Sequence, residues 1–312
     1  MLACTALLVA CGGSPGGSGG TGGSGIPGGS GDPNSGESTT SGPAYAVPGS
    51  VALVAFNEGA AQTGNDCAID TSQLAQGVVG ASARSDARLK FQVVKGEMSY
   101  NYDLPGDGTP IIVPINMGDG PYTFRVMQNT SGNNYVELFS VIDNVNLSSE
   151  TAPYLVPNMF VNYNESSAVV AKARELAQGA ANQGDVVRNI YQWVVDNITY
   201  DHDKAAQLAS ATGYVPDPDA TLASGTGICF DYASLGAAML RSLGIPCQVI
   251  TGYVSPDDVY HAWNMVYIDG EWISVEISIK PNSWTRVDLT FAASGAASTI
   301  GDGTSYTDRY TY

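Results

Sequence analysis

Short apolar runs that alternate with polar residues dominate the chain from Val51 to Ser149. Turn-forming pairs such as Lys95-Gly96 separate them, at a spacing typical of strands in an antiparallel sandwich. The runs cover residues 51–56, 89–94, 98–104, 110–115, 122–127 and 135–141. The pattern predicts an antiparallel β-sandwich of immunoglobulin-like size over residues 51–150.

The tyrosines of these runs suggest two interpretations, a carbohydrate-binding platform or core packing. They are Tyr100, Tyr102, Tyr122 and Tyr135. Aromatic side chains on strands more often pack against the core or across to the next strand. We therefore expect packing from them.

Beyond residue 157 the apolar period changes from two to that of a helix. Apolar residues on one stripe predict helices over 166–178 and 185–197. A third apolar stripe, with Leu235 and Met239, follows Cys229 and ends before Gly244-Ile245-Pro246. These helices predict an α+β chain in which a helical segment follows the sandwich.

Cys229 stands at the predicted N-terminus of the third helix. The helix dipole and the unpaired backbone N–H groups at such an end favour an anion, so a thiolate forms there more easily than in free cysteine. Downstream, His261 begins a run with a period of two that ends at the turn pair Asp269-Gly270 and predicts a strand. A cysteine on a helix tip and a histidine on a strand are typical of a nucleophile and base that folding brings together.

Such a pair needs a third group that orients the imidazole, normally a carboxylate. Two acidic residues compete for this role: Asp288 in the run 284–291, and Glu276 on the strand that follows the turn at 269–270. Each stands four residues after a tryptophan.

Five ordered motifs carry a family resemblance. They are Gly227–Ala233, Arg241–Pro246, Gly252–Val254, His261–Asn264 and Trp284–Phe291. Together they resemble the core of the transglutaminase-like superfamily, which is similar to papain-type thiol enzymes. The segment Asn197–Asp201 resembles the one that precedes this core in bacterial members, so the resemblance covers roughly the C-terminal half.

The resemblance implies a nucleophile at Cys229, a base at His261 and an orienting carboxylate at Asp288. Many members carry the acid on the strand directly after the histidine, which here is Glu276. We prefer Asp288, because its Asp-Leu-Thr-Phe resembles an Asp-Pro-Thr-Phe ending of the family. The helix tip supplies the backbone N–H of Cys229 as one oxyanion donor, and the hydroxyl of Tyr200 is a candidate for the second.

A chain of 312 residues is long enough for two folded domains with extensions. Its first apolar run, too short to span a bilayer, ends at Leu8–Cys11 and resembles the lipobox of bacterial lipoproteins. We expect a signal peptide over 1–11 with Cys11 as the acylated residue, and a disordered Gly/Ser-rich tether over 12–50. The sandwich over 51–150 and a catalytic domain over 151–312 follow. The protein is then exported and faces outward from the cell membrane as a monomer.

The formal net charge of −17 argues against nucleic acid or an anionic membrane surface as a partner. We expect a protein or peptide substrate, with cell-wall peptide as one candidate, and membrane attachment only through the lipid anchor. Two distant histidines and no paired cysteines leave a zinc site without ligands, so no cofactor is expected. Asp217 and Asp219 would need further oxygens to bind calcium.

Two function classes remain. In the first, the triad makes the protein a peptidase, an amidase or an acyl transferase. In the second, the protein is a non-enzymatic surface binding or scaffold lipoprotein that uses its β-sandwich. The intact set of Cys229, His261 and Asp288 favours the enzyme.

Overall fold

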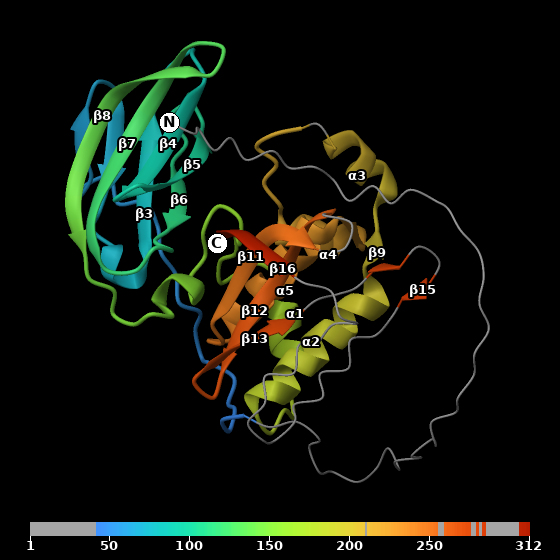
Figure 1. The fold of residues 1–312 in the computed structure, drawn as a ribbon. Coiled ribbons are helices and arrows are strands. Elements are labelled where there is room, and N and C mark those ends of the chain that lie inside the picture. Colours follow the sequence, from blue (N-terminus) through green and yellow to red (C-terminus); the bar gives the residue numbers. More distant parts are fainter. Residues whose placement is uncertain (1–41, 210, 255–258, 276–278, 281–282, 285–305) are drawn as a thin grey trace, which may run out of the picture.

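The computed structural model describes residues 42–209, 211–254, 259–275, 279–280, 283–284 and 306–312. Figure 1 shows two lobes, with the early strands in one and the helices with the late strands in the other. The chain is α+β, as the apolar pattern predicts. None of the helices in these described ranges is long and apolar enough to cross a membrane.

Two four-stranded antiparallel sheets form the N-terminal lobe. The first has the order β1-β2-β3-β6, with β1 (Gln62–Gly64), β2 (Cys67–Asp70), β3 (Val78–Ala83) and β6 (Ile111–Pro114). The second has the order β5-β4-β7-β8, with β4 (Leu89–Lys95), β5 (Met98–Leu104), β7 (Gly120–Ser131) and β8 (Asn134–Val145). Alternate residues of β4 and β7, such as Phe91 and Phe124, are buried in the core.

The strand predicted at 51–56 is wrong, because this segment forms no ladder. Phe56 instead lies so close to Gly80 that a Cβ there would come within 2.6 Å of its ring. The prediction also missed β1, β2 and β3. In β3 the run Gly80-Ala81-Ser82 has small side chains, which give little apolar alternation although the strand is buried.

The helices lie between residues 168 and 242. They are α1 (Ala168–Leu176), α2 (Gln183–Asn197), α3 (His202–Leu208), α4 (Pro218–Ser224) and α5 (Cys229–Ser242). The three predicted helices are confirmed as α1, α2 and α5, whereas the short helices α3 and α4 were not predicted. Two 3-10 turns, Leu74–Gln76 and Ala152–Tyr154, complete the set in the described residues.

A third four-stranded antiparallel sheet packs against α5 and has the order β13-β12-β11-β16. Its strands are β11 (Cys247–Val254), β12 (Val259–Ile268), β13 (Glu271–Val275) and β16 (Tyr306–Thr311). Asp269 and Gly270 join β12 to β13 with φ of 54° and 85°, as a two-residue hairpin turn requires. The predicted hairpin is confirmed, and β16 forms the edge of the sheet beside β11.

Two small ladders complete the described strands. The parallel pair consists of β9 (Thr199–Tyr200) and β10 (Thr226–Gly227), and the antiparallel pair of β14 (Ile279–Lys280) and β15 (Ser283–Trp284). The first pair leads directly into α5.

The last part of the expected tether packs on the second lobe, so its predicted end at residue 50 needs correction. Gln183 N donates to Pro43 O over 3.0 Å, and Tyr45 N donates to Ala181 O over 3.1 Å. The hydroxyl of Tyr45 also donates to Leu243 O, at the end of α5, over 3.1 Å. Proline and tyrosine interrupt the Gly/Ser composition here and supply the surface for this contact.

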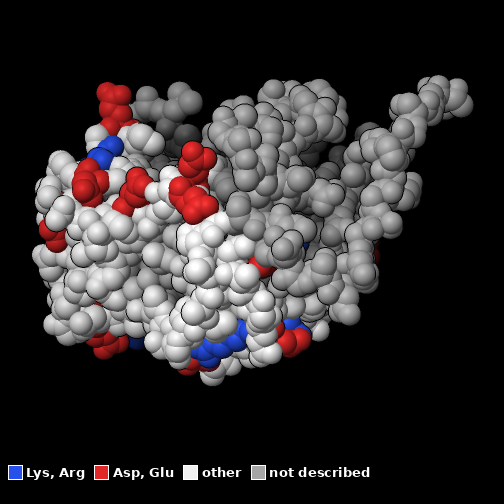
Figure 2. Space-filling model, turned by 90° about the horizontal axis from the view of Figure 1, so that it is seen from below, with Lys and Arg blue, Asp and Glu red and all other residues white. Residues whose placement is uncertain are grey.

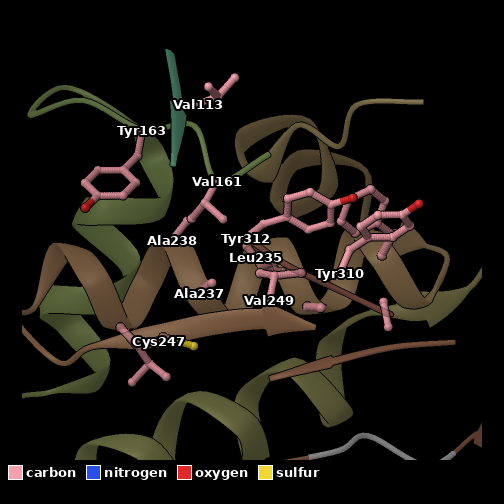
Figure 3. Close-up of a cluster of buried hydrophobic side chains, with 14 of the residues drawn as sticks. Val113, Val161, Tyr163, Leu235, Ala237, Ala238, Cys247, Val249, Tyr310 and Tyr312 are labelled. Carbon is pink, nitrogen blue, oxygen red and sulfur yellow. The ribbon is translucent and has the colours of Figure 1, made fainter. Parts of the chain in front are cut away.

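Aromatic rings join the two lobes. Tyr100 of β5 meets Tyr310 of β16 edge-on, with ring centroids 5.5 Å apart, and Tyr102 lies 6.0 Å from Phe160. Figure 3 shows Tyr310 and Tyr312 in the buried cluster that also holds residues of α5 and β11. Tyr100 and Tyr102 therefore pack as expected and are buried.

On the face seen in Figure 2, acidic side chains are scattered, and Lys and Arg side chains are fewer. This distribution agrees with the net charge of −17 for the whole chain.

Candidate active site

Cys229 is the first residue of α5 and is half-buried, which confirms its predicted place at a helix N-terminus. Gly225 ends α4 in the left-handed region, at φ 66°, and the chain then runs through β10. Ile228 is extended as the N-cap, and its N–H donates to the Asp231 carboxylate over 2.8 Å. This hydrogen bond caps the first turn of α5, the turn that carries the thiol.

His261 is half-buried on β12, opposite Gly252 of β11. The path of the chain determines which end of α5 lies near His261. β11 starts beside the C-terminal end of α5, where Arg241 Nε donates to Cys247 O over 2.8 Å. β11 therefore runs back along α5, and β12, antiparallel to β11, runs in the same direction as the helix. Cys229, the first residue of α5, and His261, the third residue of β12, thus lie towards the same end of the layer.

Asn264 fixes this alignment and was missed by sequence reasoning. Its Nδ2 donates to Ala233 O on α5 and to Gln248 O on β11, over 3.0 Å each. The hydroxyl of Tyr191 on α2 donates to its Oδ1 over 2.6 Å. A Cβ at Gly236 would lie 3.1 Å from that same Oδ1 atom, so a glycine allows the close approach. The motif His261–Asn264 includes this residue, but the sequence did not reveal its hydrogen-bond partners.

Asp231 carries a buried charge in the first turn of α5. Lys204 Nζ on α3 lies 2.7 Å from its Oδ2, and the hydroxyl of Tyr214 donates to its Oδ1. Burial, and then the neighbouring Asp231 carboxylate, raise the pKa of Tyr214. The segment before the nucleophile is therefore attached to the nucleophile's own helix through Lys204 and Tyr214.

Tyr200 lies on β9 opposite Gly227, two residues before Cys229. It is buried, and its ring packs edge-on against His202 with centroids 4.9 Å apart. Its backbone position places it near the start of α5, as its candidate role requires.

The remaining predicted site residues, Asp288, Glu276 and Cys11, lie outside the described residues. Their roles stay predictions.

Cys247 and Cys67 are buried thiols and contrast with Cys229. Burial raises the pKa of Cys247 to about 12. The pKa of Cys67 is also raised, first by burial and then by Asp66. Cys247 begins β11 and Cys67 begins β2, and both side chains pack in the core.

Within the described ranges, no group of three or more His, Cys, Asp or Glu side chains could hold a metal ion. The two aspartates considered for calcium cap and tie helices. Asp217 accepts a hydrogen bond from Ala220 N over 3.1 Å at the start of α4, and Asp219 accepts one from Val169 N over 2.8 Å.

The candidate site lies in a segment of the chain that matches a known protein family. Residues 170–277 match the sequence profile of the transglutaminase-like superfamily. This segment contains Cys229, His261 and Glu276 and ends before Asp288.

Two curated relatives and one solved structure are similar to parts of the chain. Cytokinesis protein 3 of Schizosaccharomyces pombe is 33% identical over 120 residues, 34% of this chain and 12% of that protein. Kyphoscoliosis peptidase of Mus musculus is 31% identical over 112 residues, 33% of this chain and 16% of that protein. A solved TGase is 23% identical over 39% of this chain and 34% of its own, with a TM-score of 0.32. The chain thus spans well under a fifth of the length of these two curated relatives.

Proposed function

We propose that the protein is a thiol enzyme that acts on peptide or carboxamide bonds, because residues 170–277 match the transglutaminase-like superfamily. Cys229 is the nucleophile, His261 the base and Asp288 the orienting acid. The observation that supports this most is the shared chain direction of α5 and β12, which begins both elements at one end of the layer.

The chemistry is acyl transfer through a thioester. His261 takes the thiol proton, and the Cys229 sulfur attacks the carbonyl carbon. The backbone N–H of Cys229 and the hydroxyl of Tyr200 donate to the oxyanion. When the C–N bond breaks, His261 returns the proton to the departing amine or ammonia, and the acyl group stays on sulfur. Water then releases a carboxylic acid, or a second amine forms a new amide, and either restores the thiol.

The orienting acid is proposed as Asp288, with Glu276 as the alternative. A carboxylate that accepts from one imidazole nitrogen fixes the tautomer and stabilises the imidazolium.

The protein is further proposed to be an exported lipoprotein, anchored to the membrane through Cys11 and monomeric. This proposal rests on the lipobox-like ending and the Gly/Ser-rich sequence that follows it. Detergent partitioning of the full chain beside Cys11→Ala in a bacterial host tests it, since equal partitioning of the two would contradict a lipid anchor.

The activity is tested with glutamine-containing peptides, in the presence and absence of a primary amine. The proposal expects ammonia release or amine incorporation by the wild-type protein and neither by Cys229→Ala, which stays folded. Cys247→Ala is the matched control, because its thiol is buried away from the helix tip. Equal turnover by Cys229→Ala and wild type would move the nucleophile elsewhere.

Turnover without amine identifies a hydrolase, and turnover that needs the amine identifies a transferase. The rival, a binding or scaffold lipoprotein, predicts no turnover and ordinary reactivity of Cys229.

A further inference from the structure

A buried carboxylate stands two positions after the proposed nucleophile. Asp231 is in the same helical turn as Cys229, and its side chain is 0% exposed. It accepts hydrogen bonds from three donors: Ile228 N over 2.8 Å, Lys204 Nζ over 2.7 Å and the Tyr214 hydroxyl. Only one of these donors, Lys204, carries a positive charge.

Lys204 is held in place from several sides. Asp201 N donates to Gly227 O over 2.9 Å, which ties the start of α3 to the strand before Cys229. The Asp201 side chain caps α3 by accepting from Lys204 N over 2.8 Å. The Lys204 ammonium also lies over the ring of Tyr214, 4.8 Å from its centroid. A geometry fixed by these contacts loses little side-chain entropy when the ion pair forms.

A negative charge beside a thiol opposes its ionisation and raises its pKa. Uncompensated, the Asp231 carboxylate would offset the advantage that the helix N-terminus gives Cys229. The charged and titratable groups around this end of α5 include Asp201, His202 and Lys204 at the start of α3, and Tyr214 and Asp217 before α4. Tyr200 on β9 and His261 on β12 also belong to them.

We infer that Lys204 is a positioning residue for the thiol: its ammonium neutralises Asp231 and so allows Cys229 to ionise. The inference rests on the proposed function, because it concerns the same nucleophile. Asp231 also caps the first turn of α5 by accepting from Ile228 N–H. The ion pair therefore affects both the backbone geometry and the charge near Cys229.

The test is the rate at which iodoacetamide alkylates Cys229 in the folded full-length chain at pH 7, followed by mass spectrometry of the Cys229 peptide. Lys204→Met keeps the aliphatic stem and removes the charge. We expect alkylation to slow roughly tenfold, the effect of one unit in the thiol pKa. Lys204→Arg, which keeps the charge, should stay within about twofold of wild type on the same basis.

Lys172 provides a matched control. It also forms a 2.7 Å ion pair, with Glu175, and lies over an aromatic ring, that of Trp193, at 5.5 Å. Its side chain is 26% exposed, against 30% for Lys204. Lys172→Met should leave Cys229 alkylation unchanged. Equal rates in Lys204→Met and Lys172→Met would overturn the inference and leave the proposed function standing.

Removing the carboxylate should change the rate of Cys229 alkylation in the opposite direction. Asp231→Asn leaves the Lys204 charge in place and should speed alkylation, and the double variant Lys204→Met/Asp231→Asn should recover most of the wild-type rate. If Lys204→Met fails to fold, these two variants decide: slower alkylation in both would overturn the inference. A wild-type Cys229 no more reactive than buried Cys247 would instead contradict the proposed function, and the inference with it.

Discussion

Asn264 Nδ2 on β12 lies 3.0 Å from the carbonyl oxygen of Ala233, one helical turn after Cys229. This hydrogen bond sets how far β12 is shifted along α5, and so where His261 stands relative to the thiol. A buried amide therefore links the two proposed catalytic elements.

We predict that Asn264→Ala destabilises the protein and lowers activity together. Both Ala233 O and the Tyr191 hydroxyl lose a buried partner, which costs about 2–3 kcal/mol of unfolding free energy. Denaturant unfolding measures the loss. Asn197→Ala is the control, because that side chain is exposed and donates to Trp193 O within its own helix. Equal stability of the two variants would contradict the structural role of Asn264.

Truncation separates the two parts of the expected tether. Removing residues 1–50 should lower the unfolding free energy by about 1–2 kcal/mol relative to removing 1–41, because it deletes the hydrogen bonds of Pro43 and Tyr45. Thermal melts of the two truncated proteins provide the comparison. Identical melting temperatures would mean that residues 42–50 contribute nothing to the second lobe.

Asp288→Asn is expected to reduce kcat more than Glu276→Gln. The amide would favour the wrong imidazole tautomer, an effect worth about four decades in the serine triad. The segment that matches the family ends at residue 277, so it includes Glu276 and not Asp288. The two variants therefore test which acid orients His261. A larger loss from Glu276→Gln would exchange their roles.

Alkaline pH should destabilise the protein partly through Cys247. Its pKa in the folded state is raised to about 12, so the folded protein keeps this proton where the unfolded chain, with a thiol pKa near 9, releases it. This contribution to stability is complete below pH 9 and is lost as the pH rises from 9 towards 12. By pH 11 the loss amounts to about 3 kcal/mol. The unfolding free energy of Cys247→Ala, measured from pH 8 to 11, should fall less steeply, and an equal slope would contradict the burial of this thiol.

The sequence was most informative where one strong local pattern decides the structure. The apolar stripe after Cys229 and the turn pair Asp269-Gly270 predicted α5 and the hairpin correctly. Residues 51–56 failed because apolar alternation does not reveal whether a strand has a neighbour to pair with. β3 was missed because Gly80-Ala81-Ser82 buries small side chains that carry no apolar signal.

Contacts between distant segments were beyond the reach of sequence reasoning. The ion pair of Lys204 with Asp231 spans 27 positions, and the bond from Tyr191 to Asn264 spans 73. Polar residues of these types are mostly exposed in proteins, so their sequence positions gave no reason to place them in the interior. Only the folded chain shows that these contacts connect the elements that carry the proposed nucleophile and base.

The pH dependence of Cys229 alkylation in the folded protein tests the central claim most directly, because it needs no substrate. The account predicts an apparent thiol pKa below the ordinary value of about 8.5, with Cys229 modified well before Cys247. It also predicts that His261→Ala raises this apparent pKa, since the imidazolium no longer stabilises the thiolate. A profile for Cys229 that matches free cysteine, in both wild type and His261→Ala, would contradict the account.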